Sequence, residues 1–161
     1  MSNTSVYADA LVTSLNEKAA VMKQIYDVSV SQKRLLMVDE FDMDKFEKSV
    51  SRKDDLILQV RKLDQGFDDI YSKAGPDIKE HKQIYKKQIL KMQTAITNIS
   101  DFAMKIEKLE KELKKLFETR IAAERKEISD RKKSVATAGK YYQNMANQHQ
   151  EWQSYFMDQK Q

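Results

Sequence analysis

The sequence predicts an all-α fold: an elongated antiparallel three-helix bundle or coiled coil with a long third helix. The 161 residues include only three glycines and one proline, whereas β-sandwiches and barrels need turn residues roughly every ten positions. Charged residues make up 34% of the chain, and the apolar share of 40% is modest for a thick core. Apolar residues also recur at helical spacing along most of the chain.

The first helix is predicted over about residues 5–38. Its core-facing ladder, spaced by three and four residues, reads Leu11, Leu15, Lys18, Met22, Ile25, Ser29, Gln32 and Leu36. Because the middle of this ladder is partly polar, we expect this helix to pack least well of the three. The acidic stretch after it predicts a turn, with Asp42 as the N-cap of the next helix.

The second helix is predicted over about residues 42–73, with a cleaner ladder of Phe46, Val50, Lys53, Ile57, Val60, Asp64, Phe67 and Tyr71. Gly66 lies inside it at a cost of about 1 kcal/mol relative to alanine. Close approach of another helix and simple tolerance both explain this glycine. The sequence from Ala74 to Asp77, AGPD, predicts that the helix stops and restarts, because glycine can form the C-cap and proline cannot prolong the helix.

The third helix is predicted over about residues 77–138, capped by Asp77. Its ladder reads Tyr85, Ile89, Met92, Ile96, Ile99, Ala103, Ile106, Glu110, Leu113 and Phe117, and then narrows to Ile121, Ile128 and Val135. At 1.5 Å per residue this helix is about 90 Å long, against about 50 Å for each of the others. Its last third should therefore lack full cover.

Residues 139–161 are predicted to be a separate aromatic-rich segment after the bundle of residues 1–138. They hold five of the 14 aromatic residues and only four charged ones. As a helix, this segment would place Tyr142, Met145, His149, Trp152 and Phe156 on one face. It could be a short fourth helix packed on the bundle, a partner-binding segment, or a site of self-association.

The sequence contains no catalytic constellation, so neither an enzyme, a cofactor nor a metal site is predicted. His81 and His149 have no partner at metal-ligand spacing. The acidic pairs Asp42–Asp44 and Asp54–Asp55 are interpreted as helix caps and solvated faces. With no cysteine, no bilayer-length apolar run and no signal sequence, we expect a cytoplasmic protein without stable membrane insertion.

The positive charge of the chain is concentrated in residues 77–140, which carry 17 basic and 10 acidic side chains. Lys79, Lys82, Lys86 and Lys87, and then residues 131–133, could contact phosphates. Because glutamates alternate with the lysines and no base-reading module is recognisable, we interpret these residues as a solvated helix face and predict no nucleic-acid partner.

Residues 46–71 of the predicted second helix read FEKSVSRKDDLILQVRKLDQGFDDIY. In this stretch Lys53, Leu56-Ile57, Val60, Leu63-Asp64 and Gly66-Phe67 resemble the pattern K-x-x-L-I-x-x-L-x-x-L-D-x-x-F of bacterial flagellar export chaperones of the FlgN type. The ending YF-x-D-x-K at residues 155–160 is also similar to some members. The layout of long helices in a chain of this size is similar as well.

The resemblance implies a cytoplasmic chaperone for flagellum biogenesis and type III protein export, active as a monomer or homodimer. Such a protein binds the C-terminal helical region of a secreted flagellar subunit, usually a hook–filament junction protein, and delivers it to the export gate. We expect partner contacts from two apolar regions, the edge of helix three and the aromatic-rich segment. The residues are Ile106, Leu113, Phe117, Ile121, Ile128, Tyr142, Trp152 and Phe156.

Two alternatives remain open at the level of sequence. One is a filament-cap chaperone of the FliT type, although those proteins are commonly shorter. The other is a structural coiled-coil protein that polymerises with itself. Sedimentation distinguishes a chaperone from such a scaffold, because a chaperone should remain a small monomer or dimer whereas the assemblies of a scaffold should grow with protein concentration.

Overall fold

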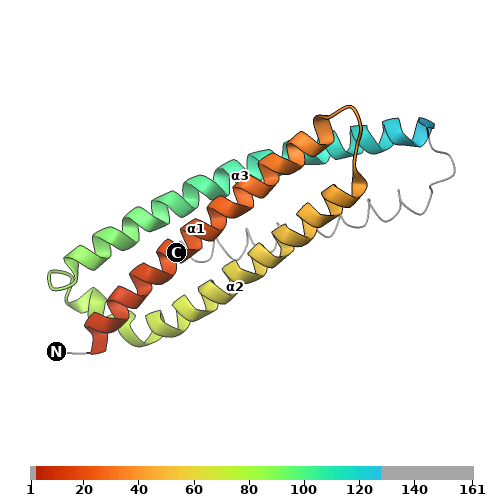
Figure 1. Ribbon diagram of the computed structural model, residues 1–161. Helices are drawn as coiled ribbons and strands as arrows, with labels where there is room; N and C mark the ends of the chain where they lie inside the picture. The colour runs from red at the N-terminus through yellow and green to blue at the C-terminus, as the bar shows by residue number, and fades with distance from the viewer. Residues whose placement is uncertain (1–2, 128–161) are drawn as a thin grey trace. The chain divides into compact units, whose positions relative to one another are not determined.

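The computed structural model describes residues 3–127, which form three long helices. They are α1 (Asn3–Met37), α2 (Met43–Glu80) and α3 (Lys86–Glu127) (Figure 1). No strand occurs within this range, so the predicted all-α three-helix bundle is confirmed for the described residues. Residues 128–138 of the predicted third helix, and the segment 139–161 with its alternative of a fourth helix, lie outside them.

The described residues divide into two compact units, and each helix contributes a segment to both. Among the described residues, the first unit contains 3–24 and 58–103, and the second contains 25–57 and 104–127. Each unit has its own buried apolar cluster.

The core of the second unit brings Leu36 of α1 and Phe46 of α2 against apolar residues of α3. Its buried members are Leu36, Phe46, Val50, Leu109, Leu113, Phe117 and Ile121. The rings of Phe46 and Phe117 stack at a centroid distance of 5.1 Å. As predicted, Asp42 caps α2: its Oδ1 accepts the backbone N–H of Lys45 at 3.1 Å.

The core of the first unit joins the start of α1 to the last turns of α2 and the start of α3. Its buried members are Ala8, Leu11, Ala74, Ile78 and Tyr85, with Phe67, Ile70, Ile89 and Met92 packed around them. In Figure 1 the first turns of α1 accordingly lie beside the connection between α2 and α3. Tyr71 and Ile96, both placed in the predicted ladders, are instead exposed.

The predicted break at Gly75-Pro76 is wrong: α2 continues through both residues to Glu80. Gly75 does not form a left-handed C-cap, because no residue in the described range has a positive φ, glycine included. Residues 77–80 therefore belong to α2, and α3 begins at Lys86 rather than at 77. Asp77 lies inside the last turn of α2 and caps no new helix.

Packing explains why the helix persists past Pro76. A proline inside a helix removes a hydrogen bond and costs about 3 kcal/mol. On either side of it, however, Ala74 and Ile78 are both buried in the first-unit core. Ser72, whose carbonyl loses its helical donor, is an exposed residue, so water can bind that oxygen. The free energy gained by burying the helical turn after Pro76 thus outweighs the tendency of Gly75-Pro76 to end the helix.

Replacing Gly66 with alanine should stabilise the protein by up to about 1 kcal/mol. A Cβ at Gly66 would meet no atom within 4 Å, so this helical glycine leaves room for the alanine methyl group. Gly75 is the matched control, since a Cβ there would lie 3.1 Å from ring atoms of Tyr71. Urea midpoints of the two variants should rank Gly66→Ala above Gly75→Ala; the reverse order would contradict this account.

Candidate functional site

Six polar residues occupy core-facing positions of the predicted ladders, and the structure buries all six. They are Lys18, Ser29, Gln32, Lys53, Asp64 and Glu110. A charge or amide in an apolar core is costly unless it finds partners there. These residues bind one another between helices, so the polar middle of α1 is part of the packed core rather than a gap in it.

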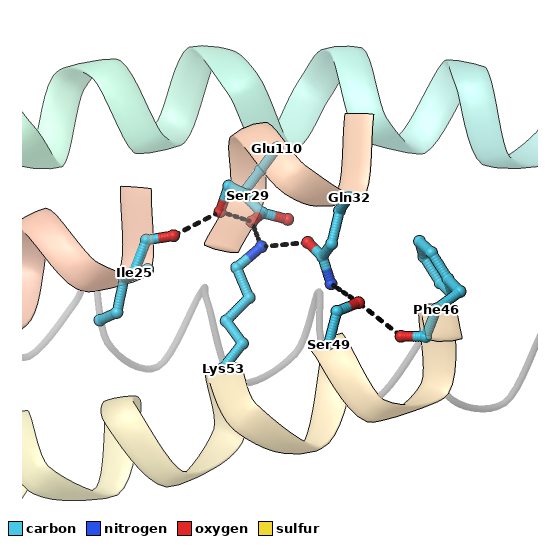
Figure 2. A network of polar contacts seen from close by, with 7 residues as sticks. All are labelled: Ile25, Ser29, Gln32, Phe46, Ser49, Lys53 and Glu110. Atoms are coloured by element: carbon cyan, nitrogen blue, oxygen red, sulfur yellow. Dashed lines mark hydrogen bonds and ion pairs between the residues drawn. The ribbon is translucent and has the colours of Figure 1, made fainter. Parts of the chain in front are cut away.

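In the second unit the Lys53 ammonium joins all three helices (Figure 2). Extending from α2, its Nζ donates to the Glu110 carboxylate of α3 and, at 2.8 Å, to Oε1 of Gln32 on α1. Ser29 of α1 donates its hydroxyl to the Ile25 carbonyl oxygen at 2.9 Å and lies 3.4 Å from the same carboxylate. Lys53 and Glu110 are therefore a buried ion pair with further polar contacts from α1.

The same network continues to the start of α2. The amide nitrogen of Gln32 donates to the Ser49 hydroxyl at 3.1 Å, and Ser49 donates in turn to the Phe46 carbonyl oxygen (Figure 2). Both ends of the Gln32 amide are thus satisfied, which fixes its orientation. The network consequently connects the buried ion pair to the apolar core around Phe46.

The free-energy cost of burying this charge is reflected in the pKa of Lys53. Burial lowers the pKa of Lys53 below its ordinary value, and the attraction of Glu110 opposes that shift without cancelling it. Removing one partner of such a pair leaves an uncompensated charge in the core, which typically costs about 3–5 kcal/mol. The network therefore favours the one helix register in which all partners meet.

The first unit has its own buried pair, between Lys18 of α1 and Asp64 of α2. Burial lowers the pKa of Lys18 and raises the pKa of Asp64, while each partner favours the charged form of the other. Oδ1 of Asp64 accepts the lysine, and Oδ2 has no hydrogen-bond partner among the described residues. Helix α2 thus contributes the acid to the pair of the first unit and the base to the pair of the second.

Neither buried pair is exposed to a ligand from solvent. Within residues 3–127, no group of three His, Cys, Asp or Glu side chains is placed to hold a metal ion. Of the described helices, none combines the length and apolar character needed to cross a membrane. The buried charges thus act on helix packing, and any partner must meet the outer faces.

The structure corrects the expected open apolar edge of helix three. Leu113, Phe117 and Ile121 lie in the second-unit cluster with residues of α1 and α2, and Ile106 is fully buried. A partner could reach these four side chains only by displacing the protein's own helices. The other four predicted contact residues, Ile128, Tyr142, Trp152 and Phe156, lie outside the described residues.

An exposed, uncharged face of α3 in the first unit is a better candidate surface. The nine residues from 92 to 100, MQTAITNIS, carry no charge, although a third of the whole chain is charged. Leu90, Gln93, Thr94 and Thr97 are exposed and follow the spacing i, i+3, i+4, i+7, so they share one side of the helix. These four residues are called the α3 face below.

The two threonines make the α3 face less polar than its sequence indicates. Thr94 and Thr97 donate their hydroxyls to the carbonyl oxygens of Leu90 and Gln93, one turn earlier, both at 3.0 Å. Because both donors are satisfied within the helix, the methyl groups remain as the contact surface of these side chains. Leu90, at 54% exposure, adds a larger apolar group. In the sequence, this face can be recognised by the absence of charged residues between positions 92 and 100.

A second exposed feature is the basic end, residues 79–91, which contain five lysines and one glutamate. It includes the turn at residues 81–85 that connects α2 to α3. Asp77 holds this turn: its carboxylate accepts His81 Nδ1 at 2.8 Å and lies 3.5 Å from the Tyr85 hydroxyl. A hydrogen bond from Thr4 and those from His81 and Tyr85 lower the pKa of Asp77.

Comparisons with protein-family models, curated proteins and solved structures find no match to this chain. The functional assignment consequently rests on the residues and geometry described above. The buried pairs explain the packing of the helices. Among the described residues, the α3 face lacks charge and the basic end is rich in lysine, so both are candidate partner surfaces.

Replacing Lys53 with methionine should destabilise the protein by about 3–5 kcal/mol, because Glu110 would remain buried without its counter-ion. The double variant Lys53→Met/Glu110→Leu should recover most of that loss, since no unpaired charge remains. Chemical denaturation of the wild type, both single variants and the double variant forms a cycle that isolates the coupling.

The control for this cycle is Lys33→Ala, which removes an ion pair of similar geometry at the surface. Lys33 Nζ lies 2.9 Å from Glu112, and both side chains are about two-fifths exposed. Solvent screens such pairs, so the variant should change stability little. Equal effects at Lys33 and Lys53 would show that burial does not set the strength of the network.

The imidazole of His81 should titrate above the ordinary histidine pKa. Its hydrogen bond to the Asp77 carbonyl oxygen raises the pKa most, followed by the bond to the Asp77 carboxylate. A raised pKa means that this contact stabilises the fold at low pH and loses that effect as the pH rises through the His81 pKa. In an NMR titration, Asp77→Asn should lower the pKa; an unchanged value would contradict the contact.

Proposed function

We propose that this protein is a cytoplasmic export chaperone of the FlgN type. In this proposal it binds the C-terminal helical region of a secreted flagellar subunit, a hook–filament junction protein, and delivers it to the type III export gate. The observation that carries the proposal is the α3 face: an exposed helix surface without charge in a protein of which 34% of the residues are charged.

The all-α three-helix bundle agrees with the layout that the resemblance implies. Within the family-like pattern of residues 46–71, the two charged positions that match are Lys53 and Asp64, and both are buried in ion pairs with other helices. Their roles in this chain are structural. The resemblance therefore supports a shared way of packing α2, and client recognition is assigned to the α3 face.

An amphipathic client helix fits this face physically. Laying its apolar side along Leu90, Thr94 and Thr97 would remove apolar surface from water at about 25 cal/mol per Å². Loss of translational and rotational freedom offsets several kcal/mol of that gain. The face is also short and contains one large apolar side chain. The expected complex is thus reversible, as hand-over to an export gate requires, and needs no nucleotide or metal.

Thr97→Glu should weaken binding of the client's C-terminal helical region by roughly tenfold or more, because the complex would bury an unpaired carboxylate. Thr119→Glu is the matched control: it makes the same change at another exposed threonine of α3. Titration calorimetry with the full-length variants measures both affinities. Equal weakening by the two substitutions would remove the α3 face from the proposal.

Partner capture from cells of the native host tests the function itself, using the full-length protein and a 1–139 truncation that melts at the same temperature. Recovery of a junction subunit by both proteins supports the chaperone and the α3 face. Recovery by the full-length protein alone assigns recognition to residues 140–161, including Tyr142, Trp152 and Phe156. Recovery of a filament-cap subunit favours the FliT-type alternative, and recovery of the protein alone favours a self-associating coiled coil.

A further inference from the structure

The basic end carries a concentrated positive charge on exposed lysines. Its five lysines, Lys79, Lys82, Lys86, Lys87 and Lys91, are all exposed. Among the described residues none of them forms an ion pair with a carboxylate; Lys79 lies over the Tyr71 ring at 5.7 Å. Glu80 is the one acidic residue between positions 79 and 91. A surface of this kind attracts an extended anionic partner.

The same end also exposes apolar side chains. Ile84 is 70% exposed, and it lies in the turn at residues 81–85 rather than on a helix face. The backbone N–H of Ile84 donates to the His81 carbonyl oxygen at 3.0 Å, and Asp77 holds His81, so this turn is an ordered structure. Val6, in the α1 segment of the same unit, is 66% exposed. Lys82, Lys86 and Lys87 thus flank an exposed apolar residue in the sequence.

We propose that the basic end binds the surface of an anionic lipid bilayer, with the lysines at the headgroups and Ile84 inserted among them. Basic residues combined with exposed apolar side chains are the usual features of peripheral membrane binding. Long lysine side chains can keep their ammonium groups at the headgroups while their methylene stems lie along apolar surface. This mode of binding requires no membrane-spanning helix, and none is found among the described residues.

A bilayer fits this surface better than the other anionic partners do. The phosphates of a nucleic acid would complement the lysines but would leave Ile84 without an apolar environment. The lysines also lie on both sides of a turn rather than along one helix face. A broad anionic surface with an apolar interior satisfies both the charges and the isoleucine. This inference does not depend on the proposed chaperone function, because neither Ile84 nor any of the five lysines belongs to the α3 face, and no client takes part.

Sedimentation of the full-length protein with vesicles tests the proposal. Binding is expected to vesicles of phosphatidylcholine mixed with an equal amount of phosphatidylglycerol, and not to phosphatidylcholine alone. Lys86→Gln/Lys87→Gln should reduce the partition coefficient by roughly 25-fold, at about fivefold for each lysine. Lys114→Gln/Lys115→Gln is the matched control, since it removes two adjacent exposed lysines from the same helix and should leave binding nearly unchanged.

The apolar contribution has its own pair of variants. Ile84→Ser should weaken vesicle binding by roughly three- to tenfold, whereas Met104→Ser, which changes a side chain of similar exposure (68%) on α3, should not. All four variants alter exposed residues, and circular dichroism checks that each remains helical.

Three outcomes would overturn the proposal. The first is no difference between the two vesicle types. The second is an equal loss of binding in the two lysine variants, which would indicate net charge rather than a site. The third is tighter binding to a short nucleic-acid duplex that depends on Lys86 and Lys87 but not on Ile84.

Discussion

The buried ion pair of Lys53 and Glu110 constrains how the three helices of the second unit pack. Lys53 reaches from α2 to a carboxylate on α3 and an amide on α1, so one ammonium group connects every helix of that unit. A helix shifted by one turn would leave at least one buried polar group without its partner, at a cost of several kcal/mol. The surrounding apolar side chains supply most of the stabilisation but are less selective for register.

In both units a buried ion pair joins two helices, but the residues and the helices differ. Lys18 and Asp64 join α1 to α2 in the first unit, whereas Lys53 and Glu110 join α2 to α3 in the second. Pairing in the wrong register would place a buried base against an apolar residue. Because these four charged side chains are buried in the core, partners can contact only residues on the outer surfaces. The charge-free α3 face and the lysine-rich basic end differ in composition, and they suit chemically different partners.

The connection between α2 and α3 shows how tertiary contacts override a local signal. Glycine followed by proline ordinarily ends a helix, yet Ala74 and Ile78 on either side are both buried, and the helix continues. Asp77, expected as an N-cap, instead binds the His81 ring and shapes the turn. That turn displays Ile84 among the lysines. Because core packing extends α2 past Pro76, the chain turns at residues 81–85, where Ile84 is exposed.

Helical spacing and local side-chain chemistry determined the fold class, the limits of α1 to within two residues, the Asp42 cap and most of the core, including its six polar positions. These features follow from the helical period of the apolar residues and from the chemistry of individual side chains, and both can be read from a single sequence. Only the tertiary structure decided that the six polar residues pair across helices, that Ile106, Leu113 and Phe117 are covered, and that α2 passes Pro76. Each of these depends on which residues of other helices lie opposite, and spacing within one helix carries no information about its neighbours.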